Sequence, residues 1–133
     1  MLIRFFCLFF AVLVLNSCSL VSPPLGQVLS GQIYWQGEVR LRGDVVLEAG
    51  SELIIAPGTK VIFETPRNGE DLYLEHPYFP GSELIVRGRL IALGTAEAPI
   101  IFMAADPDGK AGSWGGINIE ESPEVHFSHC QFS

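Results

Sequence analysis

The chain has 133 residues, a formal net charge of −7 and a hydrophobic content of 48%. This length allows one domain, and the acidic balance argues against binding to nucleic acid or to an anionic polysaccharide. The arginine pairs Arg40/Arg42 and Arg87/Arg89 stand apart from one another among acidic residues, so no local basic stripe offsets the net charge.

The first 17 residues predict a secretory signal peptide. They carry one positive charge, at Arg4, followed by an apolar run from Phe5 to Leu15. This run is too short to cross a bilayer, which takes about 20 residues, but it suits the apolar core of a signal peptide. We therefore exclude residues 1–17 from the predicted fold.

The residues that follow the apolar run, Leu15-Asn16-Ser17-Cys18, resemble the bacterial lipobox. The resemblance implies that Cys18 is lipid-modified and becomes the first residue of the mature chain, anchored to the membrane. Ser19 after the cysteine, in place of Asp, implies sorting to the outer membrane. Cys130 would then be the remaining thiol, without a partner for an internal disulfide, and cysteine preferences predict that it is buried.

Residues 18–30 are predicted to be an extended tether, because Pro23-Pro24 and Gly26 fall among polar residues. Residues 31–133 are the predicted domain, and Ile33-Tyr34-Trp35 is its first strand or an N-terminal cap. From residue 38 onward, apolar residues alternate with polar ones in short runs that stop at glycine, which predicts strands of about five residues. The residues expected to point inward are Leu41, Leu47, Leu53, Ile55, Val61, Phe63, Leu84, Val86, Phe102, Ile117 and Ile119.

The pentapeptide GSELI occurs at residues 50–54 and again at 81–85, which indicates an internal repeat. Residues 65–80 look like an inserted loop, and without them the repeat period is near 20 residues, as in solenoid proteins. A sandwich of hairpins is the competing interpretation, but the Asn-Gly hairpin signal occurs once, at Asn68-Gly69. The sequence favours a solenoid of about four or five coils.

The string GSELIVRGRLIALGTAEAPIIF, the following SWGGI and the upstream APGTKVIF resemble right-handed parallel β-helix proteins of bacterial envelopes. The resemblance covers residues 37–133 except 65–80. It implies an all-β fold, a short right-handed single-stranded parallel β-helix of the pectate-lyase-like superfold. That superfold includes lyases, hydrolases, adhesins and inert scaffolds, so it implies no particular activity. Its lyases use a carboxylate cluster for calcium and an arginine or lysine base; Arg87 and Arg89 fit by type, but no such cluster accompanies them, and we assign no catalytic residue.

A second group of polar residues lies near the C-terminus: Glu120, Glu121, Glu124, His126 and His129. Carboxylates and imidazoles can share a metal ion, but neighbouring residues on a strand point to opposite faces. A corner at His129 would leave both imidazoles outside, so we favour a solvated surface here.

The segment Asp106-Pro107-Asp108-Gly109 has two carboxylates before a glycine, as calcium loops do, but it lacks the other ligands of such a loop. Asp, Pro and Gly are turn-forming residues, and a polar turn is the favoured interpretation. The sequence therefore predicts no metal site and no cofactor.

The segment 65–80 carries the remaining candidate contacts for a ligand, namely Tyr73, His76, Tyr78 and Phe79. Their rings could stack on sugars, or they could fold back as a flap over an exposed edge. The sequence leaves both roles open and favours the flap.

Together these observations predict a lipid-anchored protein of the bacterial cell envelope, at the outer membrane and facing the periplasm or the surface. Its β-helix would be a non-catalytic scaffold or a surface for a protein or carbohydrate partner. The alternative is a β-helix protein that binds or degrades polysaccharide. Because Gln131-Phe132-Ser133 stops in mid-pattern without a polar cap, we also expect either a longer family or self-association through the open C-terminal coil.

Overall fold

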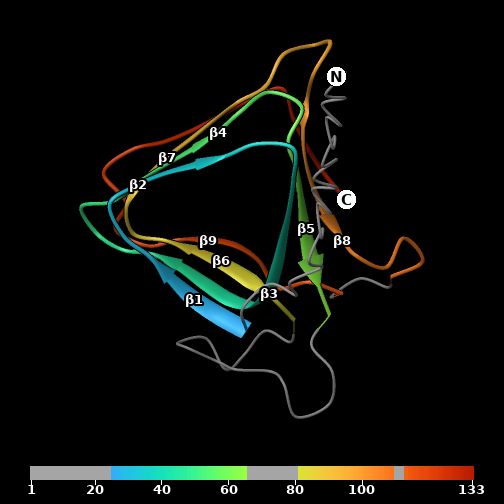
Figure 1. The fold of residues 1–133 in the computed structure, drawn as a ribbon, viewed down its shortest axis with the longest axis horizontal. Helices are drawn as coiled ribbons and strands as arrows, with labels where there is room; N and C mark the ends of the chain where they lie inside the picture. The colour runs from blue at the N-terminus through green and yellow to red at the C-terminus, as the bar shows by residue number, and fades with distance from the viewer. Residues whose placement is uncertain (1–24, 66–80, 110–112) are drawn as a thin grey trace, which may run out of the picture.

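The computed structural model describes residues 25–65, 81–109 and 113–133. These residues form strands joined by turns and contain no helix, so the described part of the chain is all-β, as the sequence predicts (Figure 1). The first strand lies within residues 18–30, the predicted tether, so regular structure begins before residue 31. In chain order the strands are β1 (Leu25–Leu29), β2 (Gln32–Trp35), β3 (Glu38–Leu47), β4 (Glu52–Ile55), β5 (Lys60–Glu64), β6 (Glu83–Val86), β7 (Arg89–Leu93), β8 (Ile100–Ala104), β9 (Gly116–Ile119), β10 (Val125–Ser128) and β11 (Cys130–Phe132).

Every strand pair among the described residues is parallel. A seven-stranded sheet has the order β11-β8-β5-β3-β6-β9, with β1 also paired to β3, and a four-stranded sheet has the order β10-β7-β4-β2. Consecutive strands of a hairpin pair antiparallel, so the described strands are not a sandwich of hairpins. Gln32 pairs with Glu52 and Glu38 pairs with Lys60, which gives offsets of 20 and 22 residues, close to the predicted period.

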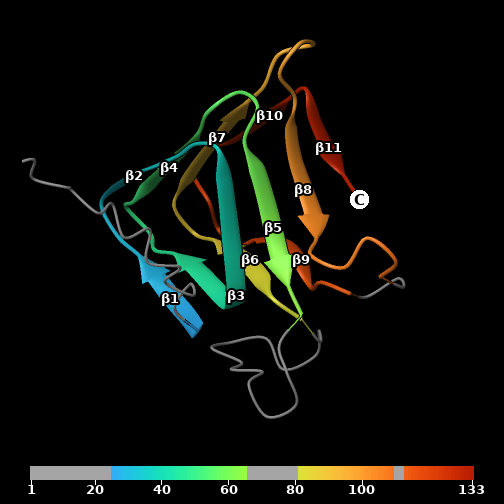
Figure 2. The same cartoon turned by 45° about the vertical axis from the view of Figure 1, so that its right-hand side comes forward.

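The larger sheet bends within β3, where Gly43 has a positive φ of 77°. The part of β3 before this glycine (38–42) pairs with β5, and the part after it (45–47) pairs with β1 and β6. Seen end-on, the strands follow the three sides of a triangle (Figure 1). From another direction, β3, β5, β8 and β11 lie side by side along one of these sides (Figure 2).

We describe the strands as four stacked layers. Layer 1 comprises β1, β2 and residues 38–42, and layer 2 comprises residues 45–47, β4 and β5. Layer 3 comprises β6, β7 and β8, and layer 4 comprises β9, β10 and β11. Each strand of layers 2 and 3 lies between strands of the two adjacent layers, whereas β9, β10 and β11 stand at the ends of their sheets.

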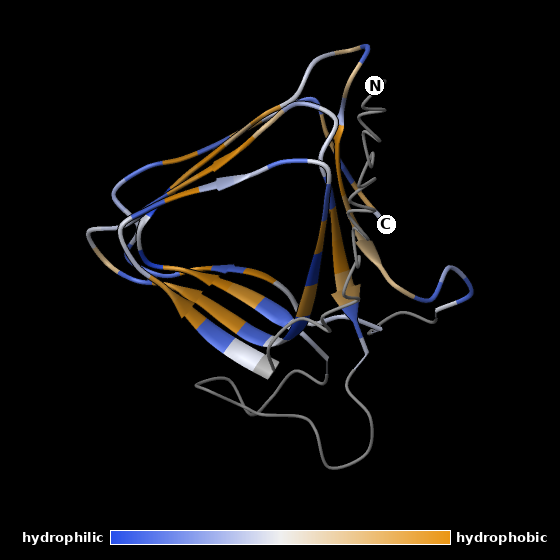
Figure 3. Ribbon diagram, in the orientation of Figure 1, coloured by the Kyte–Doolittle hydropathy of each residue, from blue (hydrophilic) through white to orange (hydrophobic). Residues whose placement is uncertain are grey.

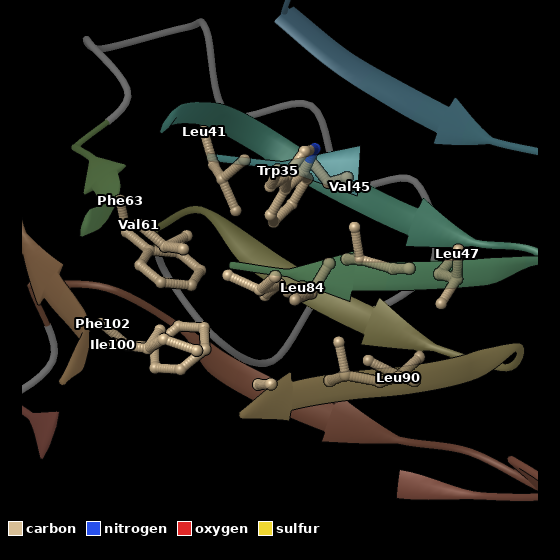
Figure 4. Packing of buried hydrophobic residues seen from close by; sticks show 14 residues of the cluster. Trp35, Leu41, Val45, Leu47, Val61, Phe63, Leu84, Leu90, Ile100 and Phe102 are labelled. Carbon is tan, nitrogen blue, oxygen red and sulfur yellow. The ribbon is translucent and has the colours of Figure 1, made fainter. Parts of the chain in front are cut away.

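The interior of the triangle is filled by aliphatic and aromatic side chains from all three sides. Hydrophobic residues gather in the strands while polar residues mark many of the corners (Figure 3), and labelled core side chains from several strands point toward one another (Figure 4). Each fully buried side chain of this kind contributes about 1.5–3 kcal/mol. The core comprises Trp35, Leu41, Val45, Leu47, Leu53, Ile55, Val61, Phe63, Leu84, Val86, Leu90, Ala92, Ile100 and Phe102.

Nine of the residues predicted to point inward are fully buried, and the two exceptions are in β9. Ile117 is half-buried, and Ile119 is 53% exposed. The prediction that Ile119 is a buried core residue is therefore wrong. Ile119 keeps the alternation and pairs with the buried Val86, but no described strand packs on the other side of layer 4.

The two GSELI copies do not occupy equivalent sides of the triangle, since the first leads into β4 and the second into β6. They nevertheless build the same local corner. Gly50 and Gly81 both have positive φ, which glycine adopts without strain. The serine that follows each of them uses its Oγ to accept a hydrogen bond from a backbone N–H of the preceding layer, at 3.0 Å for Ser51 and 2.8 Å for Ser82. The repeat is thus a corner module and not a marker of the period.

The SWGGI segment closes the approach to β9. The Trp114 ring stacks on Phe63 with ring centroids 4.2 Å apart. A Cβ at Gly115 would lie 2.2 Å from the Cγ of Glu83, a carboxylate side chain that is fully buried. Glycine is therefore required here because the Glu83 side chain lies directly against the backbone.

Candidate functional site

The outer face of the four-stranded sheet carries outward side chains in two straight rows. Because side chains alternate along a strand, the residues between buried positions such as Leu53 and Leu90 point to solvent. In-register pairing of β2, β4, β7 and β10 aligns them across the sheet. The charged row comprises Gln32, Glu52, Arg89 and Glu124, and the mixed row comprises Tyr34, Ile54, Ile91 and His126.

The charged row is a ladder of ion pairs that links three layers. The guanidinium of Arg89 bonds Glu52 of layer 2 through Nη1 and Glu124 of layer 4 through Nε. The other oxygen of Glu124 lies 2.7 Å from Nε2 of His126. The hydrogen bonds from Arg89, and secondarily that from His126, lower the pKa of Glu124, and those from Glu124 and Glu52 raise the pKa of Arg89.

The mixed row lies beside this ladder and exposes apolar surface. Tyr34 is 60% exposed and Ile54 is 38% exposed, although both lie within regular strands. A charged row next to an exposed aromatic and aliphatic row is the composition of a contact surface, because it joins apolar area to polar groups that orient a partner. We define the Tyr34 face as Tyr34, Ile54, Ile91 and His126 together with the adjacent charged row.

A pocket of about 540 Å³ opens beside the corner between β6 and β7, lined by Ala49, Arg87, Glu120 and Glu121. Arg87 bonds one oxygen of Glu120 through Nε at 3.1 Å and through Nη2 at 3.0 Å. Glu121 has a positive φ of 49°, which is uncommon outside glycine. The pocket is thus lined by an existing ion pair and one further carboxylate.

The arginines considered as bases by type, Arg87 and Arg89, are both held by carboxylates. A base must give up its proton before it can accept one. Partners that stabilise the cation oppose this loss, and the pKa of Arg89 is raised by them. Their arrangement suits structural cross-links between layers better than proton transfer.

The C-terminal group of acids and histidines is divided among separate partners. Glu120 binds Arg87, whereas Glu124 binds Arg89 and His126. His129 is at the corner between β10 and β11 with a φ of 49°, and its Nδ1 lies 3.0 Å from Oγ of the adjacent serine. Both imidazoles are on the outside, as the predicted corner required. Within the described ranges, no three of these residue types lie close enough to hold a metal ion.

The Asp106-Pro107-Asp108-Gly109 segment is a turn closed by its own groups. Oδ1 of Asp106 accepts a hydrogen bond of 3.0 Å from the N–H of Asp108, and its carbonyl accepts one of 3.0 Å from the N–H of Gly109. This is how an Asx-type turn uses aspartate, and it agrees with the turn predicted from the sequence.

The other predicted site residues lie outside the described residues. These are the lipidation candidate Cys18 and the four candidate ligand contacts Tyr73, His76, Tyr78 and Phe79. In the parts of the chain that are described, no helix is both long enough and apolar enough to cross a membrane.

The Tyr34 face was not identified from the sequence, although a signal for it exists. Tyr34 stands between the inward residues Ile33 and Trp35, so strict alternation places its ring outside. Its neighbours across the sheet come from residues 20 or more positions away, and only the observed register brings them together.

Comparisons of the chain with protein-family models, with curated proteins and with solved structures give no match.

Proposed function

We propose that this protein is a lipid-anchored, non-catalytic scaffold of the bacterial cell envelope that presents the Tyr34 face to a partner. In this proposal the stacked layers are a short right-handed parallel β-helix of the pectate-lyase-like superfold. The parallel pairing of every described strand and the enclosed aliphatic core support this assignment, together with the sequence motifs that resemble such proteins.

The observation that carries the scaffold role is the ladder through Arg89. It joins layers 2, 3 and 4 on the outside of the sheet, so the Tyr34 face is braced before any partner arrives. A preformed surface loses little conformational freedom on binding, which favours a recognition role. The same ladder occupies the charged side chains that a catalytic site would need to keep available.

The anchoring part of the proposal rests on the sequence. Lipid on Cys18 would attach the chain to the membrane, and the residues up to β1 would separate the lipid from the layered domain. Two or more acyl chains give stable anchoring, whereas one alone is marginal. Ser19 supports an outer-membrane location, facing the periplasm or the surface.

A polysaccharide-binding role is the second candidate, and the exposure of Tyr34 favours it. An aromatic ring on a flat face beside carboxylates and an arginine offers stacking and hydrogen bonding to a sugar ring. The aromatic residues at 73, 78 and 79 would add to this role if they lie near that face. A polysaccharide-degrading enzyme would need an acid and a base that are not already held in ion pairs.

Anchoring is tested with Cys18→Ala in the full chain expressed in a bacterial host, with Cys7→Ala as the matched control. We expect the unaltered chain and Cys7→Ala to sediment with membranes and to carry acyl mass on residue 18, and Cys18→Ala to lose both. A chain that stays in the membrane fraction after Cys18→Ala, with no acyl mass, would contradict lipid anchoring.

The recognition surface is tested in the same cells with a photo-crosslinking phenylalanine at Tyr34 and, as a control of similar exposure, at Val28 (60% and 54% exposed). We expect a discrete adduct from position 34 and none from position 28. A protein adduct supports the scaffold, and an adduct that a glycosidase removes supports the polysaccharide binder. Equal labelling at both positions, or none at either, would contradict a partner on the Tyr34 face.

A further inference from the structure

The layer 4 end of the stack exposes side chains that the layer below it buries. Phe132 is 54% exposed, while its register partner Phe102 is fully buried. Phe127 is likewise 38% exposed opposite the buried Ala92. Together with Ile119, these residues form an apolar surface, which we call the layer 4 end.

The strands around this surface also have unpaired edges. β9 and β11 are the two ends of the larger sheet, and β10 is an end of the smaller one. All three lie on the same end of the stack, so their free N–H and C=O groups surround the exposed apolar side chains on the three sides of the triangle. Free edges of this kind are templates for pairing with further strands.

The opposite end of the stack is different. In layer 1 the inward residues Trp35 and Leu41 are 8% and 1% exposed, so this end offers no comparable apolar surface. Layer 1 is therefore a poor match for the layer 4 end of another copy. A head-to-tail association would leave the exposed phenylalanines facing a surface that is already largely covered.

We propose that the layer 4 end binds the layer 4 end of a second copy of this chain, forming a two-fold dimer. The partner must present three strand edges around a triangle and an apolar centre, and a second copy presents both. The strands circulate in one sense around the triangle, and turning one copy over reverses that sense. β10 then runs antiparallel to β10 of the second copy, and β9 runs antiparallel to β11. Since the same surface is used twice, assembly closes at two copies.

This inference does not depend on the partner of the Tyr34 face, and its test uses the full chain extracted in mild detergent. Protein mass is measured by light scattering with absorbance and refractive index over a range of concentrations. Ile119→Lys places a charge on the layer 4 end, and Val28→Lys is its matched control because the two aliphatic residues are 53% and 54% exposed. We expect the unaltered chain and Val28→Lys to have twice the chain mass, and Ile119→Lys to dissociate at concentrations at least about tenfold higher.

A photo-crosslinking phenylalanine in place of Phe132 gives a second reading that preserves the aromatic side chain and so does not depend on how Ile119→Lys folds. We expect a covalent dimer from position 132 and none from position 34. The proposal is overturned if the unaltered chain is monomeric at every concentration, if Ile119→Lys and Val28→Lys dissociate alike, if position 132 gives no dimer adduct, or if the mass rises beyond two copies.

Discussion

Layers 3 and 4 have the same inward pattern but different surroundings. Val86, Ala92 and Phe102 of layer 3 are fully buried, while the residues beside them in layer 4 are Ile119, Phe127 and Phe132, all exposed. The direction of a side chain is thus set within its own strand, by alternation. Its burial is set by whether another layer packs on it.

The exposed phenylalanines are not without contacts on their inner side. Phe132 is nearly parallel to Phe102, with ring centroids 5.0 Å apart and an interplanar angle of 6°. Phe127 meets the Phe102 ring edge-on at 6.0 Å. Such ring pairs add about 0.5–1.5 kcal/mol beyond the area they bury. Layer 4 is therefore held from one side, and layer 3 from both.

The largest expected effect comes from truncating this aromatic pair one member at a time. Phe102→Ala leaves a cavity between layers and should lower the free energy of unfolding by about 3–5 kcal/mol. Phe132→Ala removes a ring that is half in solvent and should cost about 1 kcal/mol. Urea unfolding followed by circular dichroism, at a protein concentration where both variants are monomeric, measures the two values. Equal losses would mean that layer 4 is covered in solution.

The alternation of the sequence was sufficient to predict the strands, the inward set and the corners, because each depends on local chemistry. Glycine at positive φ and the turn at Asp106 are local features of this kind. The period near 20 residues could also be predicted, since the offset between β2 and β4 equals one turn of the chain around the triangle.

The register between layers could not be predicted, because identical segments serve different sides. Both GSELI copies place a serine hydroxyl under a backbone N–H and a leucine in the core, yet Glu52 faces Arg89 on the outside while Glu83 is buried against Gly115. The Tyr34 face depends on this register and was missed for that reason. The exposure of Ile119 was missed because alternation carries no information about what packs above a strand.

A smaller effect is expected at the corner where layers 2 and 3 touch. A Cβ at Gly88 would lie 2.4 Å from the carbonyl oxygen of Ser51 and 2.6 Å from that of Glu48, both of them backbone atoms. Gly88→Ala must push the two layers apart, and we expect a loss of about 1–3 kcal/mol in urea unfolding.

Gly31→Ala is the control for that corner, because Gly31 has positive φ but no atom within 4 Å of an added Cβ. Its expected cost is the backbone strain alone, about 1–2 kcal/mol. A Gly88→Ala variant as stable as the unaltered protein would show that the corner yields without disturbing the stack.

The ladder gives a pH-dependent comparison of the layers, because Glu124 is the carboxylate by which layer 4 binds Arg89. The pKa of Glu124 is lowered in the folded protein, first by Arg89 and then by His126. Its contribution to stability is therefore present above the unfolded pKa, about 4.3, and is lost as the pH falls through the lowered folded value. We expect Glu124→Gln to flatten the acid side of the stability profile between pH 5 and 3, by an amount that salt reduces.

Glu97→Gln, in the exposed turn between β7 and β8, makes the same charge change away from the ladder. Thermal unfolding from pH 3 to pH 7 compares the three proteins. If Glu97→Gln flattens the profile as much as Glu124→Gln does, net charge and not the ladder governs the acid response.

The smallest expected effect is chemical and concerns Cys130, the inward residue of β11 that pairs with the buried Ile100. Burial raises the pKa of the Cys130 thiol, although its Sγ also lies 3.4 Å from the carbonyl oxygen of Ala92. With Cys7→Ser and Cys18→Ser in place, we expect a disulfide reagent at pH 8 to label Cys130 several-fold more slowly than a free thiol, because less thiolate is present. Ile100→Cys with Cys130→Ser moves the thiol one layer down, where labelling should await unfolding of layer 3. Equal rates at the two positions would mean that layers 3 and 4 open together, and the contrast between a layer packed on both sides and one packed on a single side would then not extend to dynamics.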